Sequence, residues 1–185
     1  MTEPMPGGRR RIDRVLAPGY LDGLKSLPIE EVRSLRQDAE QEETDLSYLR
    51  RMLQGRIDLV RAELGNREAG SASSSVLEQL PDILRDEASS RPALGRHLTL
   101  EPSRAGEYRR SIERVVADVD ISDVTARTDA ELENTLAALV DHEATVSRTR
   151  KAVQQVADEC RKEVARRYRT GEAHVGDLLA DGPPD

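Results

Sequence analysis

Two sets of five polar residues repeat along the sequence with the same spacing. Each set runs Glu, then Ser four positions on, Arg three on, Gln four on and Asp four on. At about 100° per residue on a helix, the five side chains of a set fall within a stripe about 80° wide. Arginine donates paired hydrogen bonds, carboxylates accept them, and serine and glutamine suit phosphate or ribose oxygens. The first stripe is Glu43, Ser47, Arg50, Gln54 and Asp58, and the second stripe is Glu143, Ser147, Arg150, Gln154 and Asp158.

Outside the seam that the two segments share, identity between them is concentrated on these stripes. Between the matched positions the residues differ, as where Tyr48 corresponds to Arg148. A partial match has little meaning, because Glu107, Ser111 and Arg114 reproduce the first three positions by composition alone. A solvated face with intrahelical ion pairs is the ordinary explanation for one polar stripe. Two complete copies on matched faces favour a ligand site.

Two long helices are predicted to carry the stripes, over about 28–67 and 128–170. Apolar residues recur there at spacings of three, four and seven, which is typical of a coiled-coil seam. Thr128 and Glu131 have the spacing of a capping box at the start of the second helix. Helices of about 40 residues would be about 60 Å long and need each other for stability. The expected seam is Ile29, Val32, Leu35, Ala39, Leu46, Leu49, Leu53, Ile57, Val60 and Leu64, then Leu132, Leu136, Leu139, Val146, Thr149, Val153, Val156 or Ala157, Cys160 and Val164.

The expected fold is all-α: a long antiparallel helical hairpin, or coiled coil, with short accessory helices. Its domain spans 18–171, with an irregular connection over 68–127 in which short helices are expected at 74–86 and 106–118. Residues 1–17 are expected to be disordered or loosely ordered and 172–185 to form a C-terminal tail. Most stripe residues follow a seam residue by one position in both helices. An antiparallel pair therefore brings both stripes onto one face.

The composition fits a thin helical assembly and argues against several classes of protein. Of 185 residues, 37% are hydrophobic, 34% charged and only 2% aromatic, which favours long helices over an aromatic core. The net charge of -7 argues against direct DNA binding, because neutralising phosphates needs a positive surface. No apolar stretch suits a membrane span or a signal peptide, so we expect a cytoplasmic protein with no membrane partner. The single cysteine, Cys160, excludes an intrachain disulfide and a multi-cysteine metal site and is expected to be a buried hydrophobe.

The stripes indicate a two-fold symmetric ligand that contains guanine. Arginine can donate two hydrogen bonds to the O6 and N7 edge of guanine, while a carboxylate accepts from the ring NH and the exocyclic amine. A symmetric molecule with two guanines and two phosphates is cyclic di-GMP, expected here as a regulatory ligand and not as a catalytic cofactor. Each stripe carries two carboxylates and one arginine, so the phosphates need further cations. Auxiliary phosphate contacts are expected from Arg51, Arg56, Arg148 and Lys151.

The ten stripe residues resemble the motif of the RsiG family of streptomycete anti-sigma factors, whose helices carry E-x3-S-x2-R-x3-Q-x3-D twice. All ten positions match, and the long-helix architecture covers about 28–171. The resemblance implies that two cyclic di-GMP molecules bind as an intercalated pair across the coiled coil. It also implies that the loaded protein sequesters WhiG, a flagellar-type sigma factor that drives late sporulation genes, and releases it when the nucleotide falls.

Catalysis is not expected. His142 and Glu143 adjoin without the second histidine of a zinc protease helix, and no Glu-x-x-His motif of a di-iron bundle is present. Gly171 and Gly176 have the glycine spacing of a phosphate loop, but Asp177 stands where that loop requires lysine. The alternative that stays open is a ligand-independent helical adaptor whose stripes contact another protein.

Overall fold

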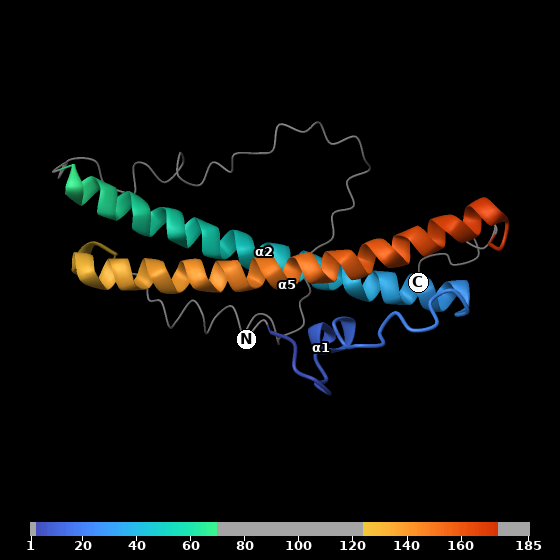
Figure 1. Ribbon diagram of the computed structural model, residues 1–185. Helices are drawn as coiled ribbons and strands as arrows, with labels where there is room; N and C mark the ends of the chain where they lie inside the picture. The colour runs from blue at the N-terminus through green and yellow to red at the C-terminus, as the bar shows by residue number, and fades with distance from the viewer. Residues whose placement is uncertain (1–2, 70–123, 174–185) are drawn as a thin grey trace, which may run out of the picture. The chain divides into compact units, whose positions relative to one another are not determined.

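The computed structural model describes residues 3–69 and 124–173, and within these ranges it contains helices and turns but no strand (Figure 1). Along the chain these are the short helix α1 (Arg11–Val15), the long helix α2 (Ile29–Glu68), the 3-10 turn η1 (Val124–Ala126) and the long helix α5 (Asp129–Thr170). The all-α prediction is confirmed. Every helix in the described ranges is too short or too polar to cross a lipid bilayer.

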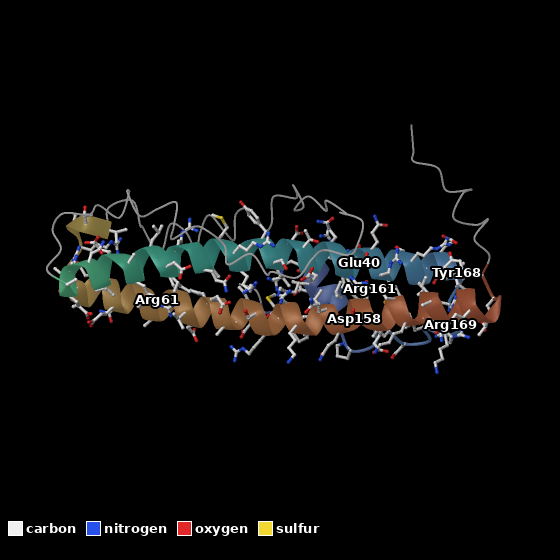
Figure 2. All side chains as sticks on the ribbon, turned by 90° about the horizontal axis from the view of Figure 1, so that it is seen from above. Glu40, Arg61, Asp158, Arg161, Tyr168 and Arg169 are labelled. Carbon is white, nitrogen blue, oxygen red and sulfur yellow. The ribbon has the colours of Figure 1, made fainter. Side chains whose placement is uncertain are left out.

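The chain divides into two compact units, and each contains a segment of both long helices. Unit 1 comprises Thr44–Arg148, and unit 2 comprises Thr2–Glu43 with Thr149–Asp185. Within each unit α2 and α5 run side by side in opposite directions (Figures 1 and 2). The cross-helix ion pairs that fix this direction are Arg50–Glu143 and Arg67–Asp129 in unit 1, and Glu40–Arg161 and Glu43–Arg150 in unit 2. The predicted antiparallel pairing of the long helices is therefore confirmed.

The predicted seam supplies the core of each unit. Leucine, isoleucine and valine side chains dominate it, and each contributes about 1.5–3 kcal/mol when fully removed from water. Where the seam left two choices, Ala157 is buried and Val156 is only half-buried, and Cys160 is fully buried as predicted. The buried seam residues are Leu46, Leu49, Leu53, Ile57, Val60, Leu132, Leu139 and Val146 in unit 1, and Val32, Ala39, Thr149, Val153, Ala157, Cys160 and Val164 in unit 2.

The start of α5 shows the predicted capping box. The Thr128 amide donates to Glu131 Oε2 over 2.8 Å, and the Glu131 amide donates back to Thr128 Oγ1 over 3.4 Å. These bonds satisfy amides that the first helical turn leaves without partners, and they hold the pKa of Glu131 below its usual value. At the other end of α5, Gly171 takes a φ of 76°, the left-handed conformation that closes many helices.

Helix α1 departs from the expectation that 1–17 is disordered or loosely ordered. Ile12 and Val15 are each only 1% exposed. The Asp13 carboxylate accepts hydrogen bonds from the Arg10 guanidinium and the Met5 amide, and these bonds hold its pKa at about 2. The proline, glycine and arginine content of this segment favours disorder. The two apolar residues Ile12 and Val15, three positions apart, are nevertheless enough to bury one helical turn.

Other expected segments lie largely outside the described residues. They are the connection 68–127 except for its ends, with the short helices expected at 74–86 and 106–118, and the tail 172–185 beyond Ala173. Within the described part of the chain, α2 begins and ends within one residue of the expected 28–67, and α5 begins one residue after the expected 128.

Candidate ligand-binding stripes

Each unit contains members of both stripes. At the first four equivalent positions, Glu, Ser, Arg and Gln, the side chains are half-buried in both stripes. At the fifth position, Asp58 and Asp158 are exposed. The two stripes therefore have the same degree of burial, position by position. Unit 1 holds Ser47, Arg50, Gln54, Asp58, Glu143 and Ser147, and unit 2 holds Glu43, Arg150, Gln154 and Asp158.

The arginine of each stripe faces the glutamate of the other stripe. In unit 2, Arg150 Nη1 lies 2.7 Å from Glu43 Oε1. In unit 1, Arg50 Nη1 lies 3.9 Å from Glu143 Oε1, a looser ion pair. Both pairs cross from one long helix to the other. The antiparallel packing thus brings together, once in each unit, the two charged groups that the sequence spacing places on different helices.

Each of these arginines also has an unused donor. The Nε atoms of Arg50 and Arg150 are buried, and neither donates a hydrogen bond to any described residue. A buried donor without an acceptor is costly and needs an explanation, such as a ligand that supplies the acceptor. Arg36 Nε is in the same condition outside the stripes, so the orphaned donor alone does not identify a site. Its recurrence at equivalent positions of both stripes distinguishes Arg50 and Arg150 from Arg36.

The remaining stripe side chains present polar groups beside these pairs. Ser147 donates through Oγ to Glu143 Oε1 over 2.8 Å. The half-buried amides of Gln54 and Gln154 make no hydrogen bond with a described residue. Their donors and acceptors are therefore available to a polar ligand.

The four auxiliary cations expected from the sequence differ in their surroundings. Arg51 and Lys151 are exposed and make no ion pair with a described residue. Arg148 is exposed and donates to Thr145 Oγ1 over 3.1 Å. Arg56 is half-buried and donates to the Met52 carbonyl over 3.2 Å, and burial lowers its pKa. Arg56 is thus turned toward its own helix backbone.

The model of the RsiG-like family matches residues 18–84 and 118–182 of the sequence, which include all ten stripe residues. The chain belongs to the RsiG-like family. RsiG-like proteins are regulatory anti-sigma factors, so the role of this chain is to bind a sigma factor. No curated protein matches the sequence.

The internal repeat of this RsiG-like chain extends beyond the five positions of each stripe. After the last aspartate of each stripe, three further identities occur at the same offset of one hundred positions. They lie outside the stripe predicted from the sequence, and the signal that marks them is the same repeat, which continues for nine residues after each last aspartate. The additional pairs are Arg61 and Arg161, Glu63 and Glu163, and Arg67 and Arg167.

In unit 1 of the RsiG-like chain, Arg67 holds the backbone that precedes α5. Its Nε donates to Glu63 Oε1 over 2.6 Å. Its Nη1 donates to the Arg127 carbonyl over 2.7 Å, and its Nη2 donates to the Val124 carbonyl over 3.1 Å. One guanidinium thereby anchors the segment before α5 to the last turn of α2.

Unit 2 repeats this arrangement at equivalent positions. Arg167 Nε donates to Glu163 Oε1 over 2.7 Å, Nη1 donates to the Leu27 carbonyl over 2.7 Å, and Nη2 donates to the Leu24 carbonyl over 2.8 Å. Hydrogen bonds from Arg166 and Arg167 outweigh the effect of burial and hold the pKa of Glu163 at about 2. In each unit this arginine, bound to its glutamate and to two backbone carbonyls, forms a clamp between the helices. The clamp sets the register of α2 against α5, and the register sets which stripe residues face each other.

A cavity of about 790 Å³ lies elsewhere in unit 2, between residues 21–26 and the last turns of α5. Its lining includes four basic residues, Lys25, Lys162, Arg166 and Arg169, two glutamates and no stripe residue. The stripes are thus helix faces, distinct from this cavity.

Proposed function

We propose that this chain binds cyclic di-GMP with its two stripes and, in the loaded form, holds the sigma factor WhiG in the cytoplasm, repressing late sporulation transcription. One observation carries the nucleotide half of the proposal. An arginine with a buried, unused Nε donor faces a glutamate of the opposite stripe, once in unit 1 and once in unit 2. Family membership supports the other half, because it makes the chain an anti-sigma factor.

Guanine chemistry supplies what these arginine–glutamate pairs lack. The Nε–H and one Nη–H of an arginine can donate side by side to O6 and N7 of guanine, and this gives the unused Nε its acceptor. A carboxylate accepts from the ring NH and the exocyclic amine of the same base. A guanine can therefore replace the direct arginine–carboxylate contact with four hydrogen bonds. Adenine carries an amino donor in place of O6, and a donor facing the guanidinium is repelled.

The other stripe residues suit the rest of the nucleotide. The amides of Gln54 and Gln154 and the hydroxyls of Ser47 and Ser147 can bond ribose and phosphate oxygens. The resemblance to the family motif implies two nucleotide molecules. The equal burial of equivalent positions in the two stripes supports a ligand that is itself symmetric.

Nucleotide control of the sigma factor follows from linkage. If the loaded protein holds WhiG more tightly than the free protein does, then WhiG must raise the affinity for nucleotide by the same factor. A fall in the nucleotide concentration then releases the sigma factor. No catalytic step is needed.

Calorimetric titration of the purified chain with cyclic di-GMP tests the nucleotide half. Binding is expected, with cyclic di-AMP much weaker. Arg50→Ala and Arg150→Ala should each weaken it by about 5- to 150-fold, the equivalent of the 1–3 kcal/mol in a bidentate base contact. Arg169→Ala, an exposed cation outside the stripes, is the control and should change nothing. Absence of binding by the unaltered chain contradicts the proposal.

Capture of WhiG on the immobilised chain tests the second half. The complex is expected with cyclic di-GMP and not without it, and Arg50→Ala should abolish capture at limiting nucleotide. Equal capture with and without nucleotide would support the ligand-independent adaptor instead.

A further inference from the structure

Each stripe has a sixth member that the motif of five does not include. Three positions after its last aspartate, each copy of the repeat carries an arginine, Arg61 in unit 1 and Arg161 in unit 2. Eleven residues separate Arg50 from Arg61 and Arg150 from Arg161, which brings the side chain to within about 20° of the motif arginine around the helix. The sixth position therefore shares the helix face of the stripe as well as the offset of the repeat.

The two arginines pair with the last aspartate of their own stripe. Arg161 Nη1 lies 2.8 Å from Asp158 Oδ1, and its Nε donates to Glu40 Oε1 of α2 over 2.8 Å, so this side chain reaches across the helix pair (Figure 2). Arg61 Nη1 lies 4.0 Å from Asp58 Oδ1. The side chains of Arg161 and Arg61 remain 51% and 60% exposed. Both guanidinium groups are thus beside the stripe and open to a ligand.

The charge of the stripe requires such a group. A stripe of five carries two carboxylates and one arginine, a net charge of -1, and a cyclic dinucleotide brings two negative phosphodiesters. Including the sixth position makes each stripe neutral. Among the auxiliary cations, Arg51 and Lys151 directly follow the motif arginines, so they lie about 100° from those arginines around the helix and just outside the stripe. Arg61 and Arg161 are the repeated cations that stay on the stripe.

We propose that Arg61 and Arg161 belong to the ligand site and bind the phosphates of the nucleotide. The inference rests on the proposed binding of cyclic di-GMP and names two contacts within that site. A guanidinium has five donors, so each arginine can keep its aspartate in place for guanine while it donates to a phosphate oxygen.

The test compares two charge-neutralising changes on adjacent residues of α5. Arg161→Gln removes the cation on the stripe, whereas Lys162→Gln removes a neighbouring cation about 100° away. Lys162 forms the same kind of intrahelical pair, 2.7 Å from Glu159 and three residues after it, so the two changes are matched in charge and in local contacts. Calorimetry with cyclic di-GMP gives the affinity of each variant, and circular dichroism gives its helix content.

The Arg61→Gln/Arg161→Gln double variant is expected to bind cyclic di-GMP at least tenfold more weakly than the unaltered chain, with its helix content unchanged. Lys162→Gln is expected to weaken binding less than twofold. Affinity in the double variant equal to that of the unaltered chain overturns the inference and leaves the proposed function standing. No binding by the unaltered chain overturns both.

A double-mutant cycle separates phosphate contact from an effect exerted only through the aspartate. If Arg161 touches the ligand, Arg161→Gln still weakens binding severalfold in an Asp158→Asn background, and Arg161→Lys recovers part of the affinity. If Arg161 acts only by holding Asp158, the change has no further effect in that background, and the proposed contact is wrong.

Discussion

Arg67 and Arg167 hold equivalent positions of the repeat, and each binds the backbone that leads into the opposite long helix. Each donates through Nε to a glutamate four residues earlier and through its Nη atoms to carbonyls two and five residues before that helix begins. The two carbonyl sets, at 124 and 127 and at 24 and 27, are themselves one hundred positions apart. The repeat therefore contains both the residues that fix the register of the two long helices and the residues of the stripes.

Loss of the clamp in unit 2 should destabilise the fold. Arg167→Met leaves the buried Glu163 carboxylate and the carbonyls of Leu24 and Leu27 without this partner, and breaking a buried ion pair from one side costs about 3–5 kcal/mol. Arg166 still binds Glu163, so we expect the low end, about 3 kcal/mol. Urea unfolding measures the change, and the exposed Arg169→Met should stay within about 0.5 kcal/mol. Equal stability of the two variants would contradict a structural clamp.

The same glutamate should make stability depend on acid. The pKa of Glu163 is about 2 in the folded protein against an ordinary value near 4.5. Because this pKa is lowered on folding, Glu163 contributes fully to the stability of the fold above pH 4.5, and this contribution is lost as the pH falls from 4.5 toward 2. Glu163→Gln should lower the thermal midpoint of unfolding at neutral pH. The midpoint of this variant should also fall less between pH 4.5 and pH 2 than that of the unaltered chain. A fall as steep as in the unaltered chain would show that Glu163 is not the group that titrates.

Exchanging the charges of a cross-helix pair should separate folding from ligand binding. Glu43→Arg combined with Arg150→Glu preserves opposite charges 2.7 Å apart in unit 2 but moves the guanidinium to the other helix. We expect helix content to be retained and cyclic di-GMP binding to be lost. The matched control is the exchange Glu159→Lys with Lys162→Glu, which inverts an ion pair away from the stripes and should leave binding unchanged. Full binding by the first exchange would make Glu43–Arg150 a structural pair only.

The two long helices and most of their buried residues could be predicted from the spacing of the apolar residues. Residues such as Leu53 and Val153 recur with a helical period, and burying each apolar row requires a second long helix beside it. The apolar spacing does not predict the burial of Glu42, a polar residue that is fully buried. It also gave too little weight to Ile12 and Val15, because a helix of one turn has too few positions to show a period.

The candidate site was predictable to the extent that it follows from the repeat. The facing of Arg50 and Glu143 follows from the antiparallel packing of two like stripes. The clamps were not predictable in the same way, because the acceptors of Arg167 are backbone carbonyls of Leu24 and Leu27. Every residue carries such a carbonyl, so no sequence pattern marks the ones that tertiary packing brings within reach.

Cys160 provides a reporter for the folded state of unit 2. It is the only cysteine of the chain and is fully buried, and burial raises the pKa of its thiol above the ordinary value. Because the thiolate is the reactive form, alkylation in the folded protein should wait for opening of the helix pair, and it should be fast in denaturant.

A ligand that binds only the closed pair slows opening-dependent labelling by a factor of 1 + [L]/Kd, about 100-fold when cyclic di-GMP is at 100 times its Kd. Mass spectrometry of the alkylated chain measures both rates. Rapid labelling of the folded protein would contradict the burial of Cys160, and slow labelling that cyclic di-GMP leaves unchanged would contradict binding to the closed helix pair of unit 2.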